Sequence, residues 1–127
     1  VNENNVPIYR YADVLLLLAE AKNNLGEDPS AEINQVRARA YGSNYNVATH
    51  GYTNSTKANN AKAILDERYK EFIGEGKRWW DLLRAGDNFV YDEVASMTSN
   101  GRKKNIYLPI SPAMIADDNT LVQTPGY

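Results

Sequence analysis

One segment, Arg10 to Leu25, limits the folds open to this chain more than any other. Its sequence, RYADVLLLLAEAKNNL, places leucine and alanine on nearly every side of a helix drawn at about 100° per residue. Only a narrow stripe of Asp13, Glu20 and Asn24 is polar. A helix that is apolar almost all round is packed on more than one side. We therefore expect other elements against at least two of its faces.

A second helix follows after a short turn. Gly26 ends the first helix, and the sequence GEDPSAEINQVRARAYG then restarts one. Its pattern predicts Asp28 as the N-cap, Pro29 at the first helical position and Gly42 as the stop. The two helices should form a helix–turn–helix hairpin.

The middle of the chain combines a loop with a third helix. Residues 43 to 60, SNYNVATHGYTNSTKANN, are polar and show no periodicity, which predicts a long loop. From about Ala61 to Phe72 apolar residues recur at steps of three and four, as on one face of a helix. Gly74 and Gly76 interrupt the pattern, which resumes through KRWWDLLRA. The chain then continues either as a kinked helix or as a separate short one.

The C-terminal tail is predicted to be irregular, apart from two local signals. TSNGRK is typical of a turn between the short apolar stretches around Val90 and Tyr107. Ser111 followed by Pro112 predicts the start of one short helix. A length of 127 residues suits one core, so we expect a single domain over residues 1–127.

Composition excludes several classes of function. A net charge of −2 offers no field that would attract nucleic acid. The chain has no cysteine, which rules out a thiolate metal site or a cysteine nucleophile. Its longest apolar run, Val14 to Ala19, is far shorter than the roughly 18 residues of a membrane span. Because the helical pattern starts soon after Val1, we expect this chain to be a segment of a longer protein.

Two arginines fall on or beside apolar helix faces. Arg68 projects into the arc that contains Ile64 and Leu65, and Arg37 flanks the face of the second helix. A buried guanidinium needs an acid or several carbonyl groups, and Glu20, Asp13 and Asp81 are available. We hypothesise that Glu20 pairs with Arg37 or Arg68. The alternative is that both arginines reach the surface along their aliphatic stems.

Signals for catalysis, metals or cofactors are weak. An acidic series on the third helix could supply a glycosidase pair, but acids on a charged amphipathic helix usually form its solvated face. The series comprises Asp66, Glu67, Glu71 and Glu75. His50 is the only histidine and has no H-E-x-x-H or nucleophile partner. We predict no enzyme activity, no metal site and no cofactor.

Aromatic residues give a better indication of binding. Tyr41, Tyr45 and Tyr52 lie in or beside the polar loop, among several asparagines. Flat rings beside amides suit carbohydrate, because a ring meets the apolar face of a pyranose while amides bind its hydroxyls. The same residues also suit ordinary loop packing. We keep the three tyrosines as candidates for ligand contact.

The adjacent tryptophans in EGKRWWDLLRAG have a different interpretation. On a helix, Trp79 points with Leu83 to the middle of an apolar arc, while Trp80 lies at its edge and Asp81 falls on the opposite, polar side. Neighbouring helical residues diverge by about 100°, so the two rings cannot form one flat platform for a sugar. We interpret the pair mainly as core and keep Trp80 as a further candidate for ligand contact.

Four motifs in order resemble the C-terminal part of the SusD/RagB family. They are PIYRYADVLLLLAEAKNNLG, AEINQVRARAYG, ILDERYKEFIGEGKRWWDLLRAG and LPISPAMIADDNTLVQTPGY. The resemblance implies a mainly α-helical fold of tetratricopeptide-like hairpins in the α-α superhelix class, with a long loop and an irregular C-terminal tail. Ligand-holding residues in characterised members lie largely outside these motifs, so none transfers by matching.

The same resemblance implies a function. Members are non-catalytic lipoproteins on the outer face of the bacterial outer membrane, anchored through an N-terminal cysteine that is not among residues 1–127. They capture glycans or related nutrients and deliver them to a TonB-dependent, SusC-like transporter. The alternative is a helical-hairpin scaffold for protein contacts, without ligand contact in this segment.

Overall fold

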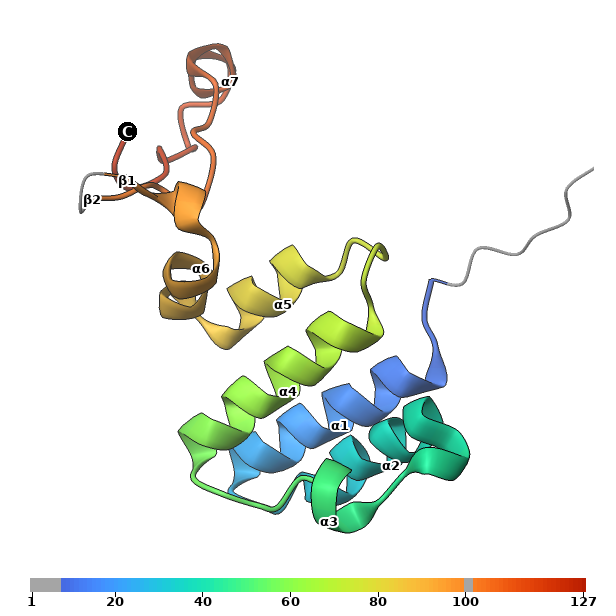
Figure 1. The fold of residues 1–127 in the computed structure, drawn as a ribbon. Helices are drawn as coiled ribbons and strands as arrows, with labels where there is room; N and C mark the ends of the chain where they lie inside the picture. Colours follow the sequence, from blue (N-terminus) through green and yellow to red (C-terminus); the bar gives the residue numbers. More distant parts are fainter. Residues whose placement is uncertain (1–7, 100–101) are drawn as a thin grey trace, which may run out of the picture. The chain divides into compact units, whose positions relative to one another are not determined.

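The computed structural model describes residues 8–99 and 102–127 (Figure 1). Its internal contacts divide the chain into two compact units, Val1–Asp81 and Leu82–Tyr127, and each is described by itself. A single domain over the whole chain stays a prediction. No helix among the described residues is long and apolar enough to cross a membrane.

Helices α1 (Tyr11–Leu25) and α2 (Ser30–Tyr41) form the predicted hairpin. Gly26 ends α1 in the left-handed region at φ 82°, and its N–H bonds to the carbonyls of Asn23 and Lys22. The predicted start of the second helix was wrong by one residue, because Pro29 occupies the N-cap position. Asp28 still caps the helix: its Oδ1 accepts the Ser30 N–H at 2.8 Å.

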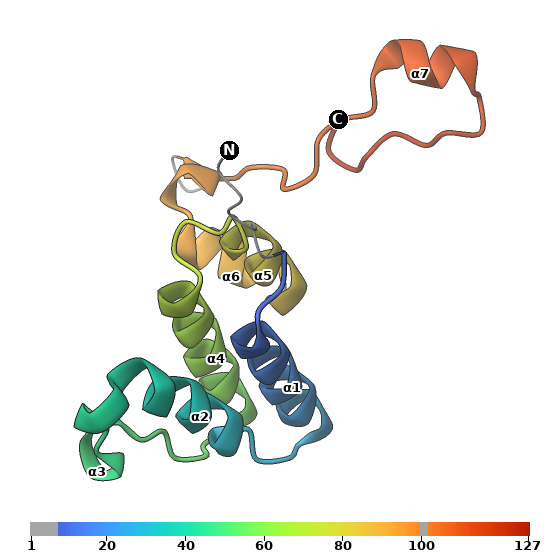
Figure 2. The same ribbon diagram turned by 90° about the vertical axis from the view of Figure 1, so that its right-hand side faces the viewer.

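Helix α1 packs on two sides, as its apolar sequence predicts. It contacts both α2 and α4 (Lys57–Glu71), and α1 and α4 lie side by side in Figures 1 and 2. Leu16, Ile33 and Ile64, one from each helix, are at most 2% exposed. Their burial makes this three-helix contact the centre of the hydrophobic core.

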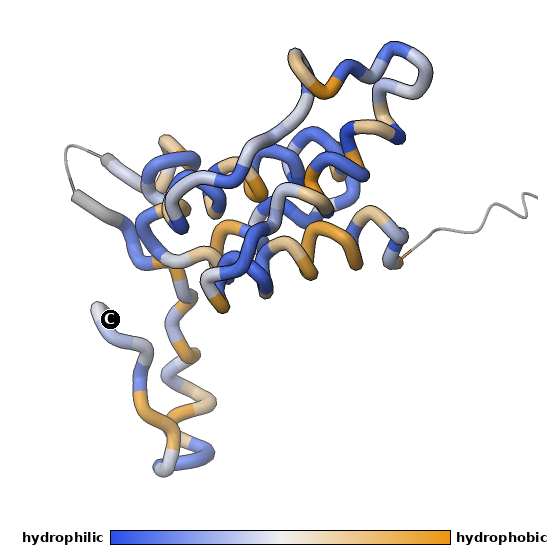
Figure 3. The backbone as a smooth tube through the Cα atoms, turned by 90° about the horizontal axis from the view of Figure 1, so that it is seen from below, coloured by the Kyte–Doolittle hydropathy of each residue, from blue (hydrophilic) through white to orange (hydrophobic). Residues whose placement is uncertain are grey.

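A third face of α1 is exposed within the first unit. Four of its exposed apolar residues are spaced by three, four and seven positions, which places them on one side of the helix. They are Tyr11, Val14, Leu18 and Leu25, each between 44% and 77% exposed. Figure 3 shows the hydrophobic colouring that runs along α1. We call this set the α1 stripe.

The loop between α2 and α4 is more ordered than predicted. It contains a 3₁₀ turn, η1 (Gly42–Asn44), and a short helix, α3 (Val47–His50), capped by the Asn46 side chain. The third predicted helix also starts about a turn earlier, at Lys57, because Thr56 caps it. Thr56 Oγ1 accepts the Asn59 N–H at 3.3 Å. Polar N-terminal turns of this kind show no hydrophobic periodicity, so their helical state was missed.

Of the two arrangements predicted after α4, the separate short helix is the one observed. α4 ends at Glu71, and Gly74 and Gly76 adopt φ values of 81° and 71° that favour glycine. The chain then enters α5 (Arg78–Ala85), which contains the boundary between the two units.

The second unit is built from short elements. They are α6 (Asp87–Glu93), the 3₁₀ turn η2 (Ala95–Met97), strands β1 (Thr98–Ser99) and β2 (Arg102–Lys103), and α7 (Pro112–Asp117). The strands are antiparallel, and residues 100 and 101 of the predicted turn lie outside the described residues. The predicted α7 start is confirmed: Ser111 caps it by accepting the Met114 N–H. α6 was missed because seven residues carry too little periodicity.

Candidate ligand-binding pocket

Three pockets of the first unit differ in their linings. One lies between α1 and α2, a second lies where α4 ends and α5 begins, and a third lies beside the α2–α3 loop. Each combines aromatic and charged side chains. The three pockets differ in how the charges are paired and in how the rings are arranged.

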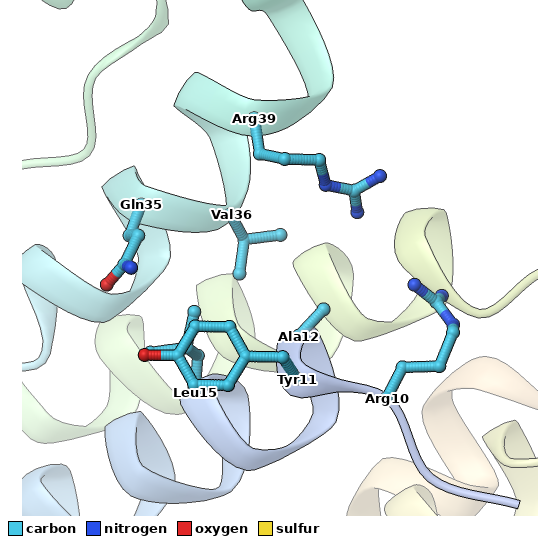
Figure 4. A pocket seen from close by; sticks show the side chains of 7 residues that line it. All are labelled: Arg10, Tyr11, Ala12, Leu15, Gln35, Val36 and Arg39. Carbon is cyan, nitrogen blue, oxygen red and sulfur yellow. The ribbon is translucent and has the colours of Figure 1, made fainter. Parts of the chain in front are cut away.

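The pocket between α1 and α2 has an apolar floor and a volume of about 300 Å³. Figure 4 shows the guanidiniums of Arg10 and Arg39 at one end and the Tyr11 ring with Gln35 at the other. Both cations already hold acids. Arg10 lies 2.7 Å from Glu71 and 2.7 Å from Glu75, and Arg39 also pairs with Glu71. The polar groups of this pocket are therefore largely committed within the protein.

Behind the second pocket lies a buried group of charges that we call the Arg68 cluster. Arg68 Nη2 lies 2.8 Å from Asp13, and its Nε lies 2.9 Å from Asp81. All three side chains are at most 3% exposed, and Lys77 adds a second cation to Asp13. The Phe72 ring lies 5.0 Å from the Arg68 guanidinium. The cluster ties α1, α4 and α5 together.

The Arg68 cluster also fixes the charge of Asp13. Burial pushes the pKa of Asp13 upward, but hydrogen bonds from Lys77 and Arg68 outweigh it, so the pKa lies below the usual 3.8. Asp13 therefore stays ionised at neutral pH, as the two cations beside it require.

The structure gives Arg37 and Arg68 different acid partners from the one we hypothesised. Arg37 Nε lies 2.8 Å from Glu67, and Arg68 lies between Asp13 and Asp81. The hypothesised pair with Glu20 is not among these contacts and stays a prediction. The alternative, that both arginines reach the surface, is wrong for Arg68, which is buried.

The interpretation of the tryptophan segment needs correction. Trp80 is 65% exposed and not core, whereas Asp81, assigned to the polar side, is 3% exposed. Arg68 draws the Asp81 carboxylate inward, and that ion pair overrides the hydrophobic pattern. Trp79 is half-buried and lines the second pocket, which has a volume of about 470 Å³. The pocket's Arg78 stacks on Tyr69 and donates to the Leu65 carbonyl.

The third pocket, beside the α2–α3 loop, presents an aromatic pair, and we call it the Tyr41–His50 pocket. The two rings are stacked, with centroids 4.0 Å apart and planes 12° from parallel. Tyr41 is 48% exposed, so much of its surface remains open. The pocket has a volume of about 340 Å³, within the range of small-molecule sites.

Polar groups surround this ring pair from α2, α3 and α4. The other lining residues are Arg37, Ala40, Thr49, Glu67, Lys70 and Glu71. Arg37 holds the loop in place, because its Nη1 donates to the His50 carbonyl at 2.9 Å while its Nε bonds to Glu67. This pocket combines an open aromatic surface with a polar rim, and of the three it is the one lined by a predicted candidate for ligand contact, Tyr41.

The other candidate tyrosines occupy different positions. Tyr45 lies 6.2 Å from His50 and 6.5 Å from Tyr41, with its hydroxyl buried, so it packs beside the pair. Tyr52 is half-buried against the core, and its hydroxyl donates to Asn60 Oδ1 at 2.7 Å. Burial raises the pKa of the Tyr52 hydroxyl despite the nearby Arg37. The structure thus brings Tyr41 and Tyr45 together, while Tyr52 and Trp80 lie outside the pocket lining.

Sequence reasoning missed His50 and the charged rim as parts of the pocket. His50 was considered only as a metal ligand or a base, and its approach to Tyr41 depends on the turn through η1 and α3. The one signal in the sequence was proximity, since His50 lies in the same loop as the candidate tyrosines.

The fold and pocket define a mainly helical protein with a helix-hairpin core and a surface pocket lined by aromatic and polar side chains. Within the described ranges, no group of three or more potential metal ligands occurs. The SusD family model matches residues 1–127, and the chain belongs to the SusD family. The predicted fold class, mainly α with tetratricopeptide-like hairpins, is confirmed.

Relatives and solved structures agree with this assignment. The chain is 39% identical over 88 residues to SusD-like protein P38 of Formosa agariphila, covering 66% of this chain and 18% of that protein. It is 26% identical to the starch-binding protein SusD of Bacteroides thetaiotaomicron, over 98% of this chain and 22% of that one. The structure of B. fragilis NanU matches 95% of this chain and 27% of its own, with 46% identity and a TM-score of 0.74. The chain therefore spans about a quarter or less of these proteins.

Proposed function

We propose that this protein captures glycans or related nutrients at the bacterial cell surface, without catalysis, and passes them to a TonB-dependent, SusC-like outer-membrane transporter. The observation that carries the proposal is the match of the SusD family model to residues 1–127. A relative named as a starch-binding protein supports a glycan as the ligand. Attachment to the outer membrane through a lipidated N-terminal cysteine belongs to the same proposal.

Within this segment, we assign ligand contact to the Tyr41–His50 pocket. The open surface of Tyr41 can meet the apolar face of a pyranose, while the exposed Thr49 and Lys70 offer polar groups to its hydroxyls. Tyr45 supports the ring pair from the side. Such a shallow site suits capture and release better than long retention.

The arrangement of acids supports a binding role over a glycosidase. A retaining or inverting enzyme needs one carboxyl as a proton donor and a second as a nucleophile or base. Glu67, Glu71 and Glu75 each form a salt bridge with an arginine. Their carboxylates are therefore paired within the protein, which favours a structural role for these three acids over a catalytic one.

Isothermal titration of the full-length protein against a panel of plant, host and microbial oligosaccharides tests the proposal. We expect one class of glycan to bind, with no release of reducing sugar. Tyr41→Ala should weaken that binding at least tenfold because it removes the open ring. Tyr107→Ala is the matched control, since Tyr107 is 59% exposed in the second unit, and it should bind like wild type.

Two results would count against the proposal. Absence of binding to every glycan in the panel would contradict the function. Unchanged binding by Tyr41→Ala, with a ligand established, would contradict the assignment to this pocket and leave the family function in place.

A helical-hairpin scaffold for protein contacts is the second candidate, and the α1 stripe favours it. Four apolar side chains exposed along one helix face are typical of a helix that packs against another surface. Under this alternative, Val14→Asp should abolish co-purification of a transporter barrel. Glycan titrations would then show no binding, and Tyr41→Ala would have no effect.

A further inference from the structure

The His50 ring is held by a hydrogen bond that specifies its protonation. The backbone N–H of Asn46 donates to His50 Nδ1 at 3.0 Å. A nitrogen that accepts a hydrogen bond carries no proton, so the proton of the neutral ring must lie on Nε2. The stacked geometry on Tyr41 thus belongs to one tautomer of the uncharged imidazole.

Backbone hydrogen bonds hold Asn46 and His50 in place on either side of this contact. The His50 N–H bonds to the Asn46 carbonyl at 2.8 Å, and the His50 carbonyl accepts from Arg37 Nη1 at 2.9 Å. Asn46 Oδ1 also caps α3 by accepting the Ala48 N–H at 2.9 Å. Both partners of the Asn46–His50 hydrogen bond are therefore fixed, and only the His50 side chain can turn.

We propose that a proton on His50 Nδ1 releases the imidazole from the Tyr41 stack, so that the Tyr41–His50 pocket binds its ligand at neutral pH and loses it in acid. The consequence for ligand rests on the proposed function. In acid an imidazole becomes an imidazolium, which carries a proton on both ring nitrogens. Nδ1 then becomes a donor that faces the Asn46 N–H, and two facing donors cannot share a hydrogen bond.

The charged groups around the ring do not hold the protonated form in place. On α4, Glu67 and Glu71 line the pocket, but Arg37 binds the first and Arg10 and Arg39 bind the second. Lys70 lines the pocket as well, and with Arg37 it opposes another positive charge nearby. The stacked Tyr41 ring attracts a cation, but the Asn46 N–H that faces Nδ1 and the charges of Arg37 and Lys70 oppose a proton at the same position. We therefore expect the imidazolium to turn toward water.

Nuclear magnetic resonance of the full-length protein without ligand tests the switch directly. With ¹⁵N-labelled histidine, we expect Nδ1 of His50 to be unprotonated and Nε2 protonated at pH 7.5. The His50 ring protons should be shifted upfield by the Tyr41 ring, and this ring-current shift should disappear by pH 5. Tyr41→Leu should remove the upfield shift at every pH, which identifies its origin.

Binding of the oligosaccharide selected by the glycan panel tests the consequence. Affinity should fall below the titration midpoint, by at most about tenfold per pH unit, the limit for release linked to one proton. His50→Phe keeps a flat ring but cannot titrate, so its affinity should be the same at pH 5.5 and pH 7.5. Tyr107→Ala should keep the wild-type pH dependence.

Clear outcomes would overturn the proposal. A proton on Nδ1 at pH 7.5, or a ring-current shift that persists to pH 5, contradicts the switch whether or not any glycan binds. Equal loss of affinity in acid by wild type and His50→Phe contradicts its link to the pocket. A glycan panel without any ligand would contradict the proposed function alone, because the ligand-free spectra still decide the switch.

Discussion

The Arg68 cluster and the Tyr41–His50 pocket are made of similar residues and behave differently. Both place arginine and acids beside an aromatic ring. In the cluster the three central side chains are at most 3% exposed, whereas Tyr41 in the pocket is 48% exposed. Burial commits the charges of the cluster to one another. Exposure leaves the rings of the pocket open to a ligand.

The comparison shows that residue type alone does not separate a stabilising site from a binding site. An ion pair in the core must be complete, because an unpaired buried charge costs several kcal/mol. An exposed charge, such as Lys70 at the pocket, can be lost at small cost. Substitutions should therefore give large losses of stability in the cluster and small ones at the exposed residues of the pocket.

Arg68→Ala should give the largest effect on stability. It leaves Asp13 and Asp81 buried without their shared guanidinium, which should lower the free energy of unfolding by about 3 to 5 kcal/mol. Urea unfolding followed by circular dichroism measures this loss. Arg39→Ala is the control, because its side chain is 59% exposed, and it should cost less than about 1 kcal/mol. Similar losses in the two variants would remove the distinction between buried and exposed charges.

Acid should reveal the same cluster through Asp13. Burial raises the pKa of Asp13, but hydrogen bonds from Lys77 and Arg68 outweigh this effect. The pKa of Asp13 is therefore lower in the folded protein than the usual 3.8. A lowered carboxyl pKa gives stability that is present above pH 3.8 and is lost as pH falls through the folded-state value. Urea titrations between pH 5 and pH 2 should show this loss in wild type. The slope should be shallower in Asp13→Asn, and identical slopes would contradict the assignment.

The sequence predicted the main helices because apolar periodicity and helix-end residues are local signals. The apolar surface of α1 indicated packing on two sides, and Gly26 and Ser111 marked helix ends through their own backbone chemistry. Elements without periodicity, such as α3 and α6, gave no such signal. Local sequence patterns therefore predict the long amphipathic helices but not the short polar helices between them.

The candidate pocket was predicted only in part, because its members meet through tertiary structure. Tyr41 and Tyr45 were predicted as candidates for ligand contact, whereas Glu67 and Lys70 reach the same pocket from α4 without any such prediction. Asp81 was placed on a polar face because a helical projection contains no information about Arg68, 13 residues earlier. Long-range ion pairs of this kind override local hydrophobic periodicity.

Two of the candidate tyrosines, Tyr52 and Tyr41, sharpen the comparison further. Tyr52→Phe removes a hydroxyl that donates to Asn60 Oδ1 at 2.7 Å, and it should lower the free energy of unfolding by about 1 kcal/mol. Tyr41→Phe removes an exposed hydroxyl at the pocket and should change stability by less than about 0.5 kcal/mol. Thermal or urea unfolding distinguishes the two. The opposite order would mean that Tyr41 is a packing residue and Tyr52 is not.

Trp80→Ala should have the smallest effect on stability, although a tryptophan is the largest side chain available to lose. The cost of truncating an aromatic residue comes from the contacts and cavity it leaves in a core, and Trp80 is 65% exposed. We expect a change within about 0.5 kcal/mol in urea unfolding. Trp79→Ala provides the matched comparison, because Trp79 is half-buried and lines the second pocket, and it should cost more. A large loss of stability in Trp80→Ala would show that the exposure of a side chain in this segment does not predict its contribution to stability. It would also weaken the contrast between the buried Arg68 cluster and the open pocket.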